Sequence, residues 1–168
     1  MHPTAGPCHG PSMEIHFNDT RQAAASAETL FDVVTDYANY PDFNSALNHV
    51  DVVRKDQEGA EFVADRKTKI GSHVRAFDTY KQEGDLVVER TYEGNESARS
   101  TWTIHALDGR HCTLNIDAVQ SMSRLQGVLM KPLLKRMFYG INFTPFIEEA
   151  ERRAREAGAP RSAHGSRS

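Results

Sequence analysis

The chain has 168 residues, of which 39% are hydrophobic, and a formal net charge of −3. This length and apolar share are typical of one globular domain with a buried core, and they exclude a wholly disordered chain. No stretch reaches the ~20 apolar residues of a membrane-spanning helix, so we do not expect an integral membrane protein. The acidic balance argues against a dedicated nucleic-acid binder, whose binding domain is usually basic.

Both ends of the chain have the composition of flexible tails. Residues 1–12 contain three prolines and two glycines, and residues 159–168 are small, polar and basic. We therefore expect disordered tails at 1–12 and 159–168 around a single domain over 13–158. The first dozen residues lack the apolar run of a secretory signal, and Cys8 and Cys112 are too few for a disulfide framework. A cytoplasmic location is the resulting expectation.

The first ordered elements are predicted to be one strand and two short helices. Alternating apolar and polar residues predict a strand within 13–25. Ser26 is a suitable N-cap for a helix whose apolar residues recur at helical spacing. Pro41 disfavours helical geometry at Tyr40, so the helix should end before it, and a short second helix or turn is expected over 42–46.

The middle of the chain is dominated by alternation of apolar and polar residues. Short turns carrying Gly, Asp or Asn separate the alternating stretches, which is typical of antiparallel strands joined as a meander. The expected strands are 47–55, 60–70, 73–83, 86–93, 98–107 and 111–122. On each strand one face is more apolar than the other. On the strand 47–55 this face carries Val50 and Val52. The sheet should therefore have one covered and one solvated face.

A long amphipathic helix is expected over 125–157, where apolar residues recur at spacings of three and four. Pro132 and Pro145 should start, kink or break this helix. Residues 121–168 carry nine basic and four acidic side chains, so a basic C-terminal part closes an acidic sheet. The predicted layout is α+β, with one long helix on a curved seven-stranded antiparallel sheet and two short helices after the first strand.

The order of these elements, together with several short segments, resembles a known superfamily. The segments are 27–36 (AETLFDVVTD), 40–43 (YPDF), 100–104 (STWTI), the turn 108–109 and 146–150 (FIEEA). They resemble the START-like (SRPBCC) superfamily, and more narrowly its polyketide cyclase/dehydrase and lipid-transport family. The resemblance implies a helix-grip fold of the START and Bet v 1 kind, in which sheet and long helix hold a hydrophobic ligand in an internal cavity. No cofactor is expected.

The inward faces of the predicted strands mix large apolar, small and polar residues, which suits a ligand cavity. The expected ligand-binding residues are Tyr40, Phe62, Ala64, Arg66, Ala76, Asp78, Tyr80, Val88, Arg90, Trp102, Ile104, Leu114, Ile116, Ala118, Leu133, Met137 and Ile141. Trp102, the one tryptophan of the chain, suits a core role and a pocket wall equally. The predicted function is to carry or sequester a small hydrophobic or aromatic ligand, such as a polyketide, lipid or isoprenoid.

Three charged residues fall on the predicted inward faces. Arg66, Asp78 and Arg90 share strand parity with apolar neighbours, so each is expected to point inward. A structural ion pair of Asp78 with one arginine and an arginine contact to a ligand oxyanion both remain open. The same parity is also compatible with a position in water at the mouth of the cavity. With Tyr80 they are also the catalytic candidates of the alternative function, a polyketide aromatase/cyclase or dehydratase. The arginine and tyrosine used by that branch of the family match positions near Tyr80 and Leu47, so neither residue type is kept.

The remaining candidates concern metals, thiols and membranes. No metal site is expected, because no histidine pair has zinc-ligand spacing with a cysteine or carboxylate. Cys112 has no basic neighbour in sequence and is interpreted as a buried, inert thiol. The segment 124–138 is interpreted either as the first turns of the long helix or as a gate in transient contact with an anionic membrane. The basic residues concerned are Arg124, Lys131, Lys135 and Arg136. A module that docks on a membrane or large complex is therefore the third functional alternative.

Overall fold

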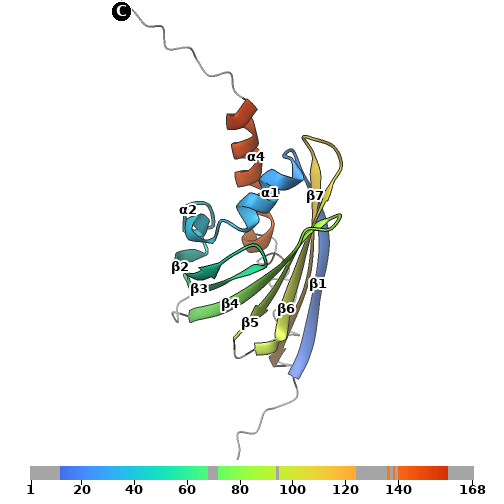
Figure 1. The fold of residues 1–168 in the computed structure, drawn as a ribbon. Helices are drawn as coiled ribbons and strands as arrows, with labels where there is room; N and C mark the ends of the chain where they lie inside the picture. The colour runs from blue at the N-terminus through green and yellow to red at the C-terminus, as the bar shows by residue number, and fades with distance from the viewer. Residues whose placement is uncertain are drawn as a thin grey trace, which may run out of the picture.

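A curved antiparallel sheet of seven strands, with helices packed against its concave face, forms the molecule (Figure 1). The computed structural model describes residues 12–67, 72–93, 95–123, 136, 138 and 140–158. The strands are β1 (Ser12–Ala23), β2 (Leu47–Lys55), β3 (Gly59–Arg66), β4 (Ser72–Lys81), β5 (Leu86–Tyr92), β6 (Asn95–Ala106) and β7 (Cys112–Ser123). The helical elements are α1 (Ala27–Val34), the 3-10 turn η1 (Tyr37–Asn39), α2 (Tyr40–Phe43) and α4 (Thr144–Gly158). The predicted helix-grip architecture is confirmed.

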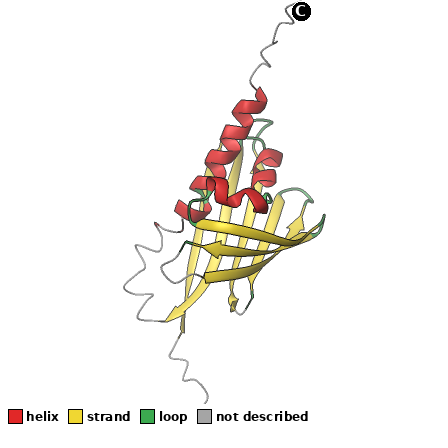
Figure 2. Ribbon diagram, turned by 90° about the vertical axis from the view of Figure 1, so that its left-hand side faces the viewer, coloured by secondary structure: helices red, strands yellow, loops and turns green. Residues whose placement is uncertain are grey.

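The strand order in the sheet is β1-β7-β6-β5-β4-β3-β2, and all neighbours are antiparallel. Strands β2 to β7 follow one another as a meander, as predicted. Strand β1 closes the far side by pairing with β7 along its whole length. The helical segment between β1 and β2 crosses the concave face, where α1 contacts β6 and α4 (Figure 2). Among the described residues, no helix combines the length and apolar character needed to cross a membrane.

Helix α1 begins at its predicted cap. The side-chain oxygen of Ser26 accepts a hydrogen bond from the backbone N–H of Thr29 at 3.2 Å, which satisfies one of the unpaired amides of the first turn. The helix buries Leu30, Val33 and Val34 against the sheet. The cap predicted from the sequence is therefore confirmed.

Helix α1 ends at Val34, before Pro41 as predicted, but the non-helical geometry expected at Tyr40 is wrong. Tyr40 has helical backbone angles (φ −51°, ψ −43°) although it precedes a proline, and α2 begins there and not at residue 42. The Tyr40 side chain is buried, and its ring lies 5.0 Å from that of Phe146 on α4. Packing of this ring outweighs the local preference that Pro41 imposes.

Pro145 does mark a helix start, as predicted, because α4 begins at Thr144 after a turn at Phe143. A proline has no N–H, so Pro145 cannot donate to the carbonyl of Ile141 one turn earlier. The side chain of Asn44 replaces this donor, with Nδ2 to the carbonyl oxygen of Ile141 at 3.0 Å. The break in the helix is thus tied to the loop after α2.

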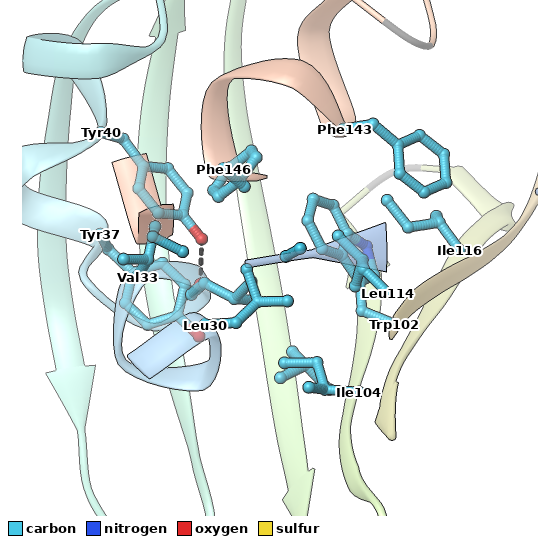
Figure 3. Packing of buried hydrophobic residues seen from close by; sticks show 14 of the residues in the cluster. Leu30, Val33, Tyr37, Tyr40, Trp102, Ile104, Leu114, Ile116, Phe143 and Phe146 are labelled. Carbon is cyan, nitrogen blue, oxygen red and sulfur yellow. Dashed lines mark hydrogen bonds between the residues drawn. The ribbon is translucent and has the colours of Figure 1, made fainter. Parts of the chain in front are cut away.

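The hydrophobic core lies between the sheet and helices α1 and α4 (Figure 3). Phe146 lies between Tyr40 and Trp102, with ring centres 5.0 Å from each. On β2, Val50 is buried as predicted. Val52 is 39% exposed, so its predicted inward position is wrong. Strand β2 is an edge strand, and its register with β3 shifts between Val52 and Arg54, which turns this end away from the core.

Candidate functional site

Two oppositely charged side chains face each other on the buried side of neighbouring strands β4 and β5. The antiparallel register pairs Asp78 with Arg90, and their side chains are 0% and 8% exposed. Arg90 donates from Nε to Oδ1 and from Nη2 to Oδ2 of Asp78, both at 2.8 Å. Such a two-point contact is a strong and geometrically specific form of arginine–carboxylate pairing. Of the alternatives left open by the sequence, the ion pair is present, and its arginine is Arg90.

Four aromatic rings surround the guanidinium of Arg90. Its carbon Cζ lies 5.0 Å from the ring centre of Phe62 and 5.2 Å from that of Trp102. The rings of Tyr37 and Tyr40 are each 5.9 Å away. Ring faces attract a cation, and more strongly where water is excluded. Burial alone would lower the pKa of Arg90, but the nearby negative charge of Asp78 holds it well above its ordinary value, so Arg90 is a permanent cation.

Two tyrosine hydroxyls extend the ion pair into a chain of hydrogen bonds. Tyr37 Oη donates to Oδ2 of Asp78 at 2.7 Å, and the hydroxyls of Tyr37 and Tyr80 lie 2.7 Å apart. Burial, and then the charge of Asp78, raises the pKa of Tyr37 far above its ordinary value. Burial also raises the pKa of Tyr80. Both hydroxyls therefore stay protonated at neutral pH.

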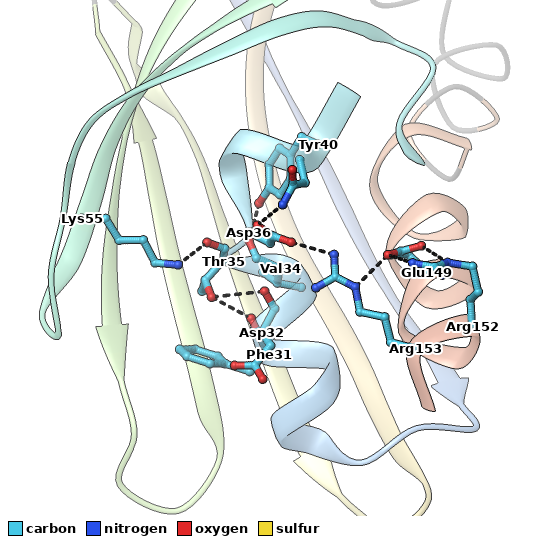
Figure 4. Close-up of polar contacts among 11 residues, drawn as sticks. Phe31, Asp32, Val34, Thr35, Asp36, Tyr40, Lys55, Glu149, Arg152 and Arg153 are labelled. Atoms are coloured by element: carbon cyan, nitrogen blue, oxygen red, sulfur yellow. Dashed lines mark hydrogen bonds and ion pairs between the residues drawn. The ribbon is translucent and has the colours of Figure 1, made fainter. Parts of the chain in front are cut away.

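Tyr40 completes the group from the helical side. Its hydroxyl donates to the carbonyl oxygen of Val34, drawn in Figure 4, and accepts from Nη2 of Arg90 at 3.2 Å. Burial raises the pKa of Tyr40 above its ordinary value, although Arg90 acts in the opposite direction. This tyrosine links the end of α1 to the ion pair on the sheet.

Small side chains continue the row of the sheet that holds the ion pair. Ser100 of β6 lies opposite Arg90, Ala118 of β7 opposite Ser100, and Phe17 of β1 opposite Ala118. The hydroxyl of Ser100 accepts from Nε1 of Trp102 at 3.0 Å. Alanine and serine leave this row of the sheet without large side chains, a pattern that suits a cavity wall better than a core of large residues does.

Most of the predicted ligand-binding residues lie on one buried surface. The buried ones are Tyr40, Phe62, Ala64, Ala76, Asp78, Val88, Arg90, Trp102, Ile104, Leu114, Ile116 and Ala118. Tyr80 and Ile141 are partly buried, whereas Leu133 and Met137 lie outside the described residues. Arg66 is exposed because β3 ends at this residue, so of the alternatives left open it has a solvated position and not a buried one. That these residues bind a ligand stays a prediction.

Tyr37 is the member of this group that the sequence did not reveal. It lies in η1, where neither the period of a helix nor that of a strand applies. The signal that could have found it is the spacing of Tyr37 and Tyr40, which one helical turn brings together with ring centres 5.3 Å apart.

A second polar cluster fastens α4 to the turn after α1 (Figure 4). Arg153 lies between two carboxylates, donating to Asp36 at 2.6 Å and to Glu149 at 2.7 Å. Arg152 also donates to Glu149, at 2.7 and 2.8 Å. The hydrogen bonds from Arg152 and Arg153 outweigh partial burial and lower the pKa of Glu149 to about 2.

A pocket of about 440 Å³ beside the cluster is lined by Asn39, Asp42, Phe43, Glu149, Arg152 and Arg153. Its polar lining does not suit an apolar ligand.

The cysteine and histidines of the described part of the chain do not gather into a reactive site. Cys112 is buried, as predicted, and burial raises the pKa of its thiol to about 11. His49, His73 and His105 are exposed. Within the described residues, no three His, Cys, Asp or Glu side chains lie where they would hold a metal ion.

Comparison with known families identifies the chain's relatives. Residues 23–142 match the family model described as polyketide cyclase / dehydrase and lipid transport. The chain belongs to this family. The matched range includes the whole of the ion-pair site, from Tyr37 to Trp102. No curated protein matches the chain by sequence.

Several solved structures share the fold at low sequence identity. The ZhuI aromatase/cyclase from Streptomyces sp. R1128 is 17% identical with a TM-score of 0.68, covering 88% of this chain and 100% of that one. A START superfamily protein from Mycobacterium smegmatis is 18% identical with a TM-score of 0.60, covering 84% and 98%. Human STARD10 is 10% identical with a TM-score of 0.69, covering 85% and 66%. Family and fold support hydrophobic ligand binding and do not decide between a carrier and a cyclase.

Proposed function

We propose that the protein binds a hydrophobic or aromatic small molecule, such as a polyketide, lipid or isoprenoid, against the inward face of the sheet. The observation that carries the proposal is the buried Asp78–Arg90 pair, held by aromatic rings and flanked by Ser100 and Ala118. A few converging polar groups in an apolar wall are the usual means of orienting a small ligand.

We further propose that the protein is a carrier and not a catalyst. Acid–base catalysis needs a group that gains and loses a proton near the working pH. Arg90 is a permanent cation, and the pKa values of Tyr37, Tyr40 and Tyr80 are all raised above their ordinary range. Both carboxylate oxygens of Asp78 already accept hydrogen bonds. These five side chains are therefore suited to orienting a ligand and poorly suited to exchanging protons with it.

Ligand binding is tested with the purified full chain. Native mass spectrometry and solvent extraction should find a co-purifying hydrophobic molecule, and the neutral dye Nile red should bind. Ala118→Phe should weaken dye binding, because it places a large ring on the inward face of the sheet, two strands from Arg90. Asp117→Phe is the matched control, since Asp117 is exposed and adjacent strand residues point to opposite faces of the sheet. Absence of both a co-purifying molecule and dye binding would contradict the proposal.

A polyketide aromatase/cyclase or dehydratase is the second candidate function. It is favoured by the family and by the way the fold gathers Asp78, Tyr80 and Arg90, three of the four catalytic candidates, into one site. The fourth candidate, Arg66, is exposed at the end of β3. Turnover of a model poly-β-ketone that is lost in Tyr80→Phe and kept in Arg66→Ala would establish this function over the carrier.

Contact with an anionic membrane and a cytoplasmic location stay predictions. Of the basic residues concerned, the structure describes Arg136, which is exposed on a helical turn. Arg124, Lys131 and Lys135 lie outside the described residues. Co-sedimentation with anionic liposomes should occur at low salt and weaken as salt rises, because exposed charges are screened. Binding that does not weaken with salt would contradict an electrostatic contact.

A further inference from the structure

The direction of each hydrogen bond in the chain from Tyr80 to Asp78 follows from counting hydrogens. A tyrosine hydroxyl carries one hydrogen and a carboxylate carries none. Tyr37 gives its hydrogen to Oδ2 of Asp78, so it has none left for Tyr80. The 2.7 Å contact between the two hydroxyls must therefore be donated by Tyr80. What Tyr80 still offers to a ligand is an oxygen lone pair, which can only accept.

The same group of residues is balanced in charge. The positive charge of Arg90 faces the negative charge of Asp78 at 2.8 Å, and two of its nitrogens are engaged there. One of them, Nη2 of Arg90, also donates to the hydroxyl of Tyr40. An anionic ligand would leave its water shell for a site whose cation is already neutralised. Burying such an additional charge is costly.

Tyr80 is the most exposed member of this hydrogen-bonded network. Counted over the whole residue, backbone included, the exposed fraction of the other members is 0% for Tyr37, 2% for Tyr40, 4% for Asp78 and 7% for Arg90. Tyr80 is only partly buried, and its ring meets the ring of Phe31 edge-on at 5.6 Å. An apolar molecule that packs beside these two rings places its polar group near the hydroxyl of Tyr80.

We propose that the ligand is a neutral molecule that donates a hydrogen bond to the hydroxyl oxygen of Tyr80, as an alcohol or phenol does, and that carboxylates are disfavoured. This inference rests on the proposed function and adds the chemical class of the ligand's polar group. It makes Tyr80 a specificity-determining residue and makes Tyr37 the residue that sets the direction in which Tyr80 points its hydrogen.

Three naphthalene derivatives with one ring system test the proposal by displacing bound Nile red from the full chain. They are 2-naphthol, which donates, 2-methoxynaphthalene, which only accepts, and 2-naphthoate, which is anionic. One hydrogen bond to a neutral partner changes affinity by about threefold to tenfold. We expect 2-naphthol to displace the dye at a concentration about threefold to tenfold lower than 2-methoxynaphthalene needs. We expect 2-naphthoate to need a higher concentration than either.

Two variants separate the direction of the hydrogen bond from the apolar contact. Tyr80→Phe removes the acceptor, so the affinity of 2-naphthol should fall to within about twofold of that of the ether, whose own affinity stays unchanged. Tyr37→Phe leaves the hydrogen of Tyr80 without its acceptor, so Tyr80 becomes a donor and the ether should gain affinity relative to 2-naphthol. Circular dichroism verifies that each variant is folded, and Tyr80→Phe alone suffices should Tyr37→Phe fail to fold.

The possible results separate this inference from the function on which it rests. If the wild-type chain neither binds Nile red nor carries a co-purifying hydrophobic molecule, the proposed function fails. If the dye binds, but the ether or the carboxylate displaces it at the same concentration as 2-naphthol, the ligand does not need a hydrogen-bond donor. Ligand binding itself then stands. Failure of every naphthalene to displace the dye, or a 2-naphthol advantage that survives Tyr80→Phe, also overturns the assignment of Tyr80.

Discussion

Removing the charge of Asp78 while keeping its shape tests how the buried ion pair is held. Asp78→Asn replaces an acceptor of three hydrogen bonds at 2.7–2.8 Å, two from Arg90 and one from Tyr37. Arg90 remains with a side chain that is 8% exposed, so it cannot regain a full shell of water. Removing one partner of a buried pair costs about 3–5 kcal/mol, and the rings around Arg90 offset part of this. We expect a loss of about 3 kcal/mol from a total that is typically about 5–15 kcal/mol.

Urea denaturation followed by Trp102 fluorescence measures this loss. Glu89→Gln is the matched control, because the Lys81–Glu89 pair joins the same two strands on the opposite face at 2.6 Å, with side chains 59% and 44% exposed. An exposed pair contributes less than about 1 kcal/mol. The double variant Asp78→Leu with Arg90→Met should regain most of the lost stability, since no buried charge remains. A loss of stability in Asp78→Asn no larger than in Glu89→Gln would contradict this expectation. So would a double variant that is less stable than Asp78→Asn.

Three further changes have expected outcomes. Ser26→Ala removes the cap of α1 and should lower the free energy of unfolding in urea by about 1 kcal/mol, whereas an unchanged midpoint would contradict the cap. Hydrogen bonds, largest from Arg152, lower the pKa of Glu149 from 4.5 to about 2, so its ion pairs stabilise the fold above pH 4.5 and are lost as the pH falls toward 2. The stability difference between wild type and Glu149→Gln should shrink over that range, and a constant difference would refute this assignment. In a Cys8→Ser background, Cys112 should resist a thiol reagent at mildly alkaline pH until urea unfolds the chain, because its thiol is buried with a pKa of about 11; rapid labelling of the native protein would disprove this.

Strand periodicity predicted the inward face of the sheet because side chains alternate strictly between the two faces of a strand. Parity alone placed Asp78 and Arg90 on the same face. It did not place them opposite each other, because that depends on the register set by the turn between β4 and β5. The turn contains Gly84 with φ +82°, a left-handed conformation that glycine adopts at no steric cost. The residue-level pairing therefore needed the structure.

The remaining differences arise where long-range packing decides local geometry. Tyr40 is helical before a proline because its ring is buried against α4. Val52 and Arg66 share the parity of buried neighbours but lie where a register shift or the end of a strand takes them out of the core. Tyr37 joins the site from a turn without periodicity. A sequence pattern describes which face a residue is on, and it does not describe how far the covering helices reach along that face.

The pairing of β1 with β7 also bears on how the chain folds. Strands β2 to β7 are joined by short turns and can pair locally, but Asn18 on β1 and its partner Asp117 on β7 are 99 residues apart. Closing so long a loop costs entropy before any contact compensates for it, so local hairpins should form first. Helix α4 comes after β7 and packs on α1, which comes after β1, so both ends of the chain join a meander that already exists. The surface that carries Asp78 and Arg90 should then be covered in the last stage of folding, when α1 and α4 close over the sheet.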